Sequence, residues 1–238
     1  MNKAKFDQDD SCWQWLYRLG GIAALITAIF IPLQVVIFMT WPPPTTALGY
    51  FTLAQTNPLA VLLDLDLLLL ADQMLGIVIL VALYIALRRT NESVMTVMLA
   101  LGLIAAAAYV ASNTAVNMLT LGNQYNVATA DVQRAMYLAA GESMLAIYTG
   151  TAFQLSYILG ALVGTTIGVV MWRSELFSKT TATMGILANV ISLGLYVPAV
   201  GLYISIFSVL FLEIFYILVA RRFFQMGRRE SHLTLQPA

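Results

Sequence analysis

The sequence predicts an all-α fold, a polytopic transmembrane helical bundle of six spans with one or two short amphipathic helices in the outer loops. Three observations lead to this prediction. The 238 residues are 60% hydrophobic and only 10% charged, whereas soluble domains carry about 25% charged residues. Apolar stretches of about 20 residues, long enough to cross a ~30 Å hydrocarbon core, recur along the chain. Basic residues gather at alternate ends of these stretches.

Six stretches meet the length and apolarity of a span. They cover roughly residues 19–41, 61–87, 94–121, 151–172, 180–197 and 202–220. The first is too long for the apolar region of a cleaved signal peptide, and Asp7, Asp9 and Asp10 precede it, so we expect a retained helix. A turn is expected at residues 197–201, because Pro198 lacks an N–H and disfavours helix in the residue before it.

The basic residues predict the direction of the chain. With six spans, eleven of the twelve Lys and Arg residues fall on one side of the membrane, and only Arg134 falls on the other. The positive-inside rule then places both termini in the cytoplasm. The expected parts are a cytoplasmic N-terminal segment (1–18), a six-helix transmembrane domain (19–220) and a basic cytoplasmic tail (221–238).

Two outer loops are long enough to hold structure. These are residues 45–57 and residues 129–147. The second loop places five apolar residues near one helical face: Val132, Met136, Ala139, Met144 and Ile147. We expect both loops to cap the bundle or to lie on the outer leaflet, because neither is long or apolar enough to span.

Small and polar residues recur at helical spacing within the spans and mark their inward faces, because lipid offers no hydrophobic drive for helix association. The stripes are Ala24, Thr27 and Gln34; Gly102, Ala106, Tyr109, Asn113 and Asn117; Tyr157, Ala161, Gly164 and Gly168; Gly185, Asn189, Ser192 and Tyr196; and Ser205, Ser208, Glu213 and Tyr216. The run Gly160-x3-Gly164-x3-Gly168 fits close helix packing or a homodimer face. With five other helices in the chain, we expect packing within the bundle.

Three aspartates interrupt the leucine run at residues 60–75. Asp64 and Asp66 are expected at the outer interface, in contact with water. Asp72 lies sixteen residues from Arg88, which is about 24 Å along a helix axis and therefore inside the core. A central Asp costs about 3 kcal/mol, which the surrounding leucines, isoleucines and valines outweigh. Asp72 should face the interior, where a carboxyl group is a functional-site candidate.

The other polar residues of the stripes complete a candidate ligand site or pathway. Counting helical rises places Gln34, Tyr109, Tyr157 and Tyr196 at heights similar to that of Asp72. Asn113 and Asn117 extend the site along the third span, and Asn189 and Glu213 lie deeper, where we expect a hydrogen bond between them. The full set is Asp72, Gln34, Tyr109, Asn113, Asn117, Tyr157, Tyr196, Asn189 and Glu213.

Several function classes are disfavoured. The only histidine, His232, lies in the tail, so the spans cannot build the zinc site of a ceramidase-type hydrolase or a Ser–His catalytic pair. A formal net charge of zero argues against nucleic acid as a partner. We expect no enzymatic activity, no cofactor and no metal.

Two function classes remain open. The first is transporter-like handling of a small solute in a polar intramembrane cavity in the outer half of the bundle. The second is a non-transporting binding, regulatory or assembly module that binds a lipid or a partner protein. Both place the chain in a lipid bilayer, and the intramembrane carboxyl groups favour the first class slightly.

Local motifs add a resemblance. "RLGGIAALI" at residues 18–26 opens the first predicted helix, "LYIALRRTN" at residues 83–91 closes the second, and a basic tail follows the sixth. In this pattern, about residues 15–225 resemble an uncharacterised bacterial family of six-helix integral membrane proteins, known as a domain of unknown function. The resemblance implies six helices and a bacterial plasma membrane, and it implies no site residue.

Overall fold

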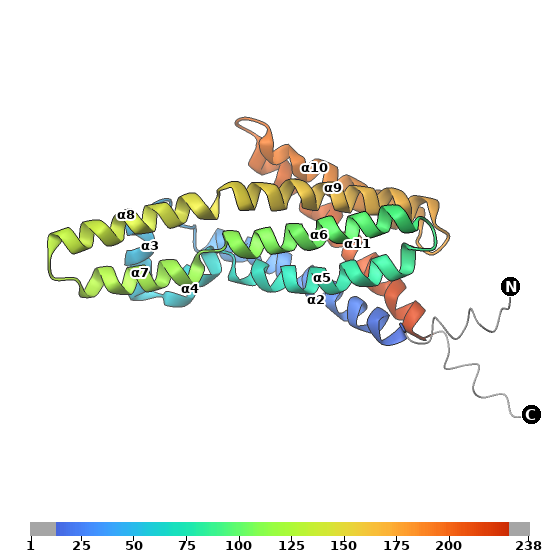
Figure 1. The fold of residues 1–238 in the computed structure, drawn as a ribbon, viewed down its shortest axis with the longest axis horizontal. Helices are drawn as coiled ribbons and strands as arrows, with labels where there is room; N and C mark the ends of the chain where they lie inside the picture. Colours follow the sequence, from blue (N-terminus) through green and yellow to red (C-terminus); the bar gives the residue numbers. More distant parts are fainter. Residues whose placement is uncertain (1–12, 229–238) are drawn as a thin grey trace, which may run out of the picture. The chain divides into compact units, whose positions relative to one another are not determined.

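The structure, a computed structural model, describes residues 13–228, and in these residues it contains helices and no strand (Figure 1). The predictions for residues 1–12 and 229–238, which include most of the N-terminal segment and the end of the tail, lie outside the described residues. The helices are α2 (Gln14–Thr40), α3 (Ala47–Thr56), α4 (Pro58–Asp64), α5 (Leu67–Leu87), α6 (Glu92–Ser112), α7 (Ala115–Val127), α8 (Asp131–Tyr148), α9 (Thr151–Arg173), α10 (Lys179–Ser192), the 3₁₀ helix η1 (Leu193–Tyr196) and α11 (Gly201–Arg228).

Five helical segments are long and apolar enough to cross a membrane, which indicates a multi-pass membrane protein. They are Gln14–Thr40, Leu67–Leu87, Glu92–Val127, Asp131–Arg173 and Gly201–Arg228. Large apolar side chains on these segments are exposed, for example Ile29 at 62% and Leu210 at 59%. Extensive exposed apolar surface is unusual in a soluble protein and suits contact with lipid.

The stretch 180–197, predicted as the fifth span, is shorter than the other five. It forms α10, with 14 residues, and η1, with 4 residues. The turn predicted at residues 197–201 is confirmed: it follows η1 and includes Ala199 with a positive φ of 69°. α11 then continues to Arg228, so residues 221–228 are helical and do not belong to an irregular tail.

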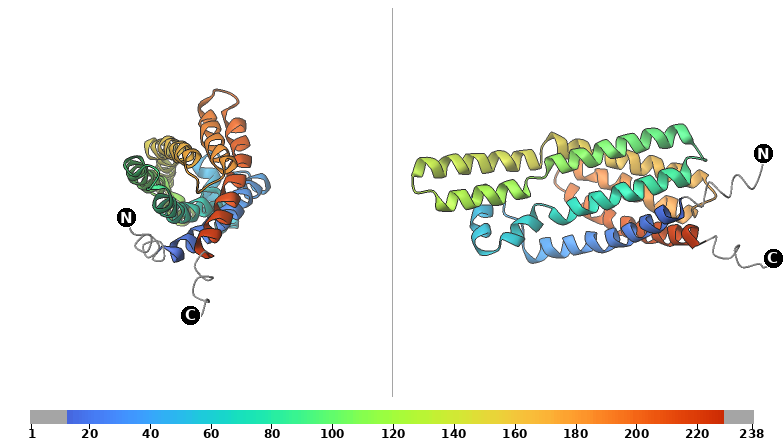
Figure 2. Two further views of the ribbon diagram at one scale, coloured as in Figure 1. Left: turned by 90° about the vertical axis from the view of Figure 1, so that its right-hand side faces the viewer. Right: turned by 60° about the horizontal axis from the view of Figure 1, so that its bottom comes forward.

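The described chain forms two compact units. Unit 1 comprises residues 13–29, 74–103 and 159–228, and unit 2 comprises residues 30–73 and 104–158. In unit 1, α10 and α11 lie side by side (Figure 2). The core of unit 1 contains Leu87, Met171, Val219 and Phe223, all fully buried.

The glycine run of α9 packs only in part against this hairpin. A Cβ on Gly168 would lie 2.7 Å from Ile186 Cγ1, and one on Gly164 would overlap the side-chain amide of Asn189. Both glycines therefore permit close approach of α10. A Cβ on Gly160 would meet no atom of another helix within 4 Å among the described residues, so the prediction that Gly160 packs closely within the bundle is wrong.

Unit 2 is built around Phe51 of α3, which is fully buried. Its ring lies against Gly122 of α7 and Gly141 of α8, where an added Cβ would be 3.2 Å and 2.7 Å from it. α7 and α8 run antiparallel and are joined by a short turn (Figure 1). Glu142 Oε1 accepts a hydrogen bond from Ala47 N at 2.9 Å and fixes the start of α3.

The inward face of α8 differs from the predicted one. Leu138, Leu145 and Tyr148 pack on the core of unit 2, whereas Val132 and Met136 are 73% and 67% exposed. Ala139 and Ile147 are exposed as well, and of the predicted face only Met144 packs on the core. The apolar residues of α8 surround the helix, so periodicity alone did not select the face that meets Phe51.

Candidate functional site

The candidate site is centred on the segment Asp64–Leu65–Asp66 of unit 2. The sequence predicts one continuous helix over 61–87, but α4 ends at Asp64 and α5 begins at Leu67. Asp66 has a φ of 63°, in the left-handed region that Asp adopts more readily than most residues. The chain therefore bends sharply immediately before the span Leu67–Leu87.

Both acidic side chains of this segment are buried. Asp64 is 2% exposed and Asp66 is 6% exposed, so the expectation that water solvates them is wrong. The reason is the helix break, which places Leu65 in the core of unit 2 beside Phe51 and Met118. Burying a carboxyl group is costly unless other groups bind it or it takes up a proton.

Two tyrosine hydroxyls bind Asp66. Asp66 Oδ2 accepts a hydrogen bond from Tyr109 Oη of α6 at 3.2 Å and another from Tyr148 Oη of α8. Phe153 of α9 lies beside both rings, with centroid distances of 6.4 Å to Tyr109 and 6.5 Å to Tyr148, and it stacks on Tyr157 at 6.0 Å. The two tyrosines that bind Asp66 therefore belong to a larger group of aromatic rings.

Two amide side chains satisfy the backbone at the break. Gln34 Nε2 of α2 donates to Leu63 O at 3.0 Å, and Asn113 Nδ2 donates to Leu65 O at 2.7 Å. A broken helix leaves carbonyl groups without their usual partners, and in a membrane protein side chains must replace them. Both amides belong to the predicted site, and the structure brings them to this segment.

Asp64 is different, because neither of its carboxylate oxygens has a hydrogen-bond partner among the described residues. The same holds for Gln34 Oε1 and Thr114 Oγ1. Gln34 donates a hydrogen bond to Leu63, which precedes Asp64, and Thr114 follows Asn113, which donates to Leu65. Buried polar atoms without partners are rare and require an explanation. The carboxylate and amide oxygens among them are acceptors that lack a donor, and the Thr114 hydroxyl can accept or donate.

The burial of Asp64 and Asp66 and their hydrogen bonds determine the pKa values of the two carboxyl groups. Burial, and then the neighbouring charge of Asp66, raises the pKa of Asp64 to about 6. Burial raises the pKa of Asp66 to about 6 as well, and the hydroxyls of Tyr148 and Tyr109 oppose the increase. Burial and the two carboxylates also raise the pKa of Tyr50 of α3 above its ordinary value. We call Asp64, Asp66, Tyr50, Tyr109 and Tyr148 the acidic cluster.

Residues at helix breaks and helix ends supply two of the contacts to the segment Asp64–Leu65–Asp66. Asn113 lies between the end of α6 and the start of α7, and Tyr148 is the last residue of α8. The break at Asn113–Thr114 also changes the helical register. The buried positions of α7 are Ala115, Met118 and Gly122. Asn117 is consequently exposed, so its predicted inward position is wrong.

Asp72 lies in α5 of unit 2 and is half-buried. Its charge acts on Tyr109 of the acidic cluster. The sequence interpretation therefore selected an acidic residue that belongs to the region but missed the two that are most deeply buried. The length of α5 could have indicated that Asp64 and Asp66 lie outside the span, because its 21 residues suffice for a span without residues 61–66.

The remaining predicted residues belong to unit 1. Asn189 Nδ2 donates to Gly185 O of its own helix at 2.8 Å. The predicted hydrogen bond between Asn189 and Glu213 stays a prediction. Glu213 is half-buried in α11, and Tyr196, in η1, is 46% exposed.

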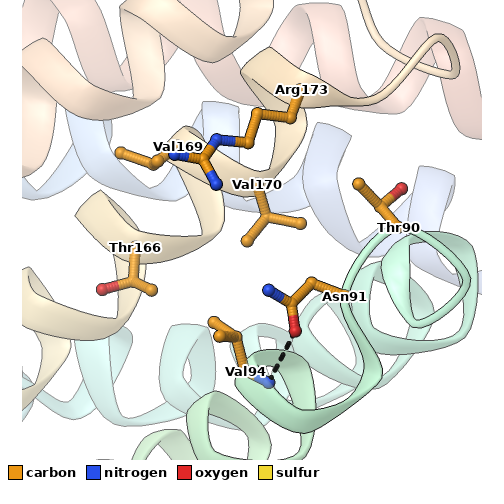
Figure 3. Close-up of a pocket in the computed structure, with 7 residues that line it drawn as sticks. All are labelled: Thr90, Asn91, Val94, Thr166, Val169, Val170 and Arg173. Atoms are coloured by element: carbon orange, nitrogen blue, oxygen red, sulfur yellow. Dashed lines mark hydrogen bonds between the residues drawn. The ribbon is translucent and has the colours of Figure 1, made fainter.

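Unit 1 also contains a pocket of about 370 Å³ (Figure 3). Its lining consists of Thr90, Asn91, Val94, Thr166, Val169, Val170 and Arg173. Asn91 Oδ1 accepts a hydrogen bond from Val94 N at 3.2 Å and so stabilises the start of α6. Arg173 is the one charged residue of the lining and is exposed. The pocket has no buried polar atom without a partner, in contrast to the acidic cluster.

Comparisons with known proteins give no relative. No family model, no curated protein and no solved structure matches the chain. Between residues 13 and 228 there is also no group of three or more His, Cys, Asp or Glu side chains that could hold a metal ion. The chemistry of the acidic cluster is therefore the main guide to function.

Proposed function

We propose that the protein is a six-span plasma-membrane protein with both termini in the cytoplasm, and that it handles a small solute at the acidic cluster in the manner of a transporter. The observation that carries this proposal is the carboxyl group of Asp64, which is 2% exposed and has no hydrogen-bond partner among the described residues. We assign the plasma membrane to a bacterium on the resemblance of residues 15–225 to an uncharacterised bacterial family.

The dimensions of α10 and η1 support a sixth span. With 14 residues in α10 and 4 in η1, the pair extends about 29 Å at 1.5 Å per α-helical and 2.0 Å per 3₁₀ residue. This length is close to the ~30 Å hydrocarbon core. Six spans also keep Arg88 and Arg221 on the same side as Arg18, as the positive-inside rule requires.

Solute handling is supported by the kind of backbone that surrounds the acidic cluster. Broken helices whose free backbone groups are bound by side chains are typical of binding sites in secondary transporters. The break at Leu65–Asp66 and the break at Asn113–Thr114 are joined by the hydrogen bond from Asn113 Nδ2 to Leu65 O. Buried oxygen acceptors without donors favour a solute that carries positive charge or N–H and O–H groups.

A second candidate function is a non-transporting module that binds a lipid or a partner protein. Val127, Val132 and Met136, at 79%, 73% and 67% exposure, favour it, because large exposed side chains on neighbouring helices offer an apolar contact surface. Gly160, where an added Cβ would meet open space among the described residues, is a candidate position for contact with a second copy of the chain.

A flux measurement on reconstituted protein distinguishes transport from the non-transporting binding module. Vesicles containing the full chain and an internal pH dye are exposed separately to Na⁺, K⁺, tetraethylammonium, arginine and glutamate. We expect at least one cation to change the internal pH, and glutamate to have no effect. Asp64→Asn should abolish the change, whereas Asp131→Asn, which replaces an exposed carboxylate, should retain it.

Two results would argue against transport. One is wild-type protein that is folded in the vesicles and leaves the internal pH unchanged with every cation. The other is a lipid or protein that copurifies with the chain in a fixed ratio while no flux is measured, which would favour the binding module.

A further inference from the structure

The two carboxyl groups of the acidic cluster have unequal surroundings. Asp66 accepts hydrogen bonds from two hydroxyl groups, whereas Asp64 accepts none from the described residues. Hydrogen-bond donors stabilise the charged form of a carboxyl group, and burial without donors stabilises the neutral form. When one proton binds to the pair, Asp64 is therefore the favoured position.

No positive charge is available to neutralise both groups. Residues 30–73 and 104–158, which make up unit 2, contain one basic residue, Arg134, and no Lys or His. Arg134 is exposed, and its Nε donates to Ala128 O at 3.0 Å. A buried charge requires a partner or loses its charge. Because no cation from unit 2 lies beside it, the pair must bind a proton or a cation.

The groups that face the pair are known for each neighbouring helix. The titratable side chains are Tyr50 from α3, Tyr109 from α6 and Tyr148 from α8, with Asp72 on α5 acting on Tyr109. The tyrosines donate or lie close as neutral hydroxyls, and Asp72, when it is ionised, adds negative charge. None of them replaces the missing positive charge, so the surroundings favour protonation of one carboxyl group.

We propose that Asp64 binds one exchangeable proton beside an ionised Asp66, and that this proton is the coupling ion of the protein. The protonated group becomes a donor, and Gln34 Oε1 and Thr114 Oγ1 are buried oxygen atoms without partners in adjoining segments. The absence of a three-residue metal-binding group from residues 13–228 disfavours a divalent cation in place of the proton.

The acidity of the pair suits exchange near neutral pH. Burial and the charge of Asp66 raise the pKa of Asp64 from 3.8 to about 6. A carboxyl group with this pKa gains and loses its proton within the physiological range, whereas an ordinary Asp remains ionised. The coupling role rests on the proposed function, but the protonation of Asp64 does not.

Infrared difference spectroscopy of the full chain in detergent detects the proton directly. The carbonyl band of a protonated carboxylic acid is recorded between about pH 5 and about pH 8, on either side of the raised pKa. We expect a band that disappears as the pH rises, that is weaker in Asp64→Asn and that keeps its intensity in Asp131→Asn. Tyr148→Phe, which removes one donor to Asp66, should move the transition upward by about one pH unit.

The outcomes separate the two proposals. A wild-type protein without a pH-dependent band would overturn the proton site, and so would a band that keeps its full intensity in Asp64→Asn and vanishes in Asp66→Asn. A band with the expected behaviour in a protein without flux supports the proton site and refutes only the transport proposal. Flux that persists unchanged in Asp64→Asn would refute the coupling role.

Discussion

The stability of the protein should depend on pH through Asp64, and Asp64→Asn should reduce that dependence. The pKa of this group is raised from 3.8 to about 6 by burial and by the charge of Asp66. The folded state therefore binds the proton more tightly than the unfolded state. Its stabilising contribution is fully present below about pH 4 and is lost as the pH rises through about 6.

The magnitude follows from the size of this shift. A difference of about two pKa units corresponds to at most about 3 kcal/mol, since one unit is about 1.4 kcal/mol. For a chain of this length, about 3 kcal/mol corresponds to a change in Tm of roughly 5–10 °C. Wild-type protein should therefore melt at lower temperature at pH 7 than at pH 5, and Asp64→Asn should melt above wild type at pH 7.

Thermal unfolding of the detergent-solubilised protein across a series of pH values measures the effect. Asp131→Asn is the matched control, because Asp131 is exposed and its replacement changes the net charge by the same amount. The reasoning is refuted when Asp64→Asn keeps the full pH dependence of wild type. It is also refuted when wild-type protein becomes more stable as the pH rises from 5 to 7.

Two further predictions concern a hydrogen bond at a helix break and the packing of the glycines of α9. Asn113→Leu removes the donor to the Leu65 carbonyl at the helix break and should lower the free energy of unfolding by about 1–3 kcal/mol. Asn117→Leu, at an exposed position, should change the free energy of unfolding little. Equal Tm values for the two variants would contradict the assigned hydrogen bond. Gly168→Ala places a Cβ 2.7 Å from a side-chain atom of α10 and 3.2 Å from its backbone and should cost about 1–3 kcal/mol. Gly160→Ala adds a methyl group in open space and should be neutral or stabilising by up to about 1 kcal/mol; a Tm that falls as far as in the Gly168 variant would show that both glycines pack alike.

Much of the fold was predictable because the determinants of a span are local and additive. Length and apolarity identified the helical segments that form the five candidate spans. Helical spacing placed Ala24, Thr27 and Gln34 on the inward face of the first span, and all three are buried. The turn after η1 followed from Pro198, whose effect on the backbone depends on its immediate neighbours alone.

The candidate site was predictable only in part. Tyr109 and Asn113 lie on one helical stripe, and both contact the segment around Asp66. The same stripe failed at Asn117, because the break at Asn113–Thr114 rotates the residues that follow it. Periodicity assumes an uninterrupted helix, so it loses its value at the places where helices break.

The sequence by itself determined that this chain is helical, apolar and suited to a bilayer, because those properties are sums over neighbouring residues. Only the tertiary structure decided that Asp64 and Asp66 are buried. The hydroxyl groups that bind Asp66 come from Tyr109 and Tyr148, 43 and 82 residues further along the chain. A carboxyl group is buried or solvated according to what covers it, and in this protein the covering residues are distant in sequence.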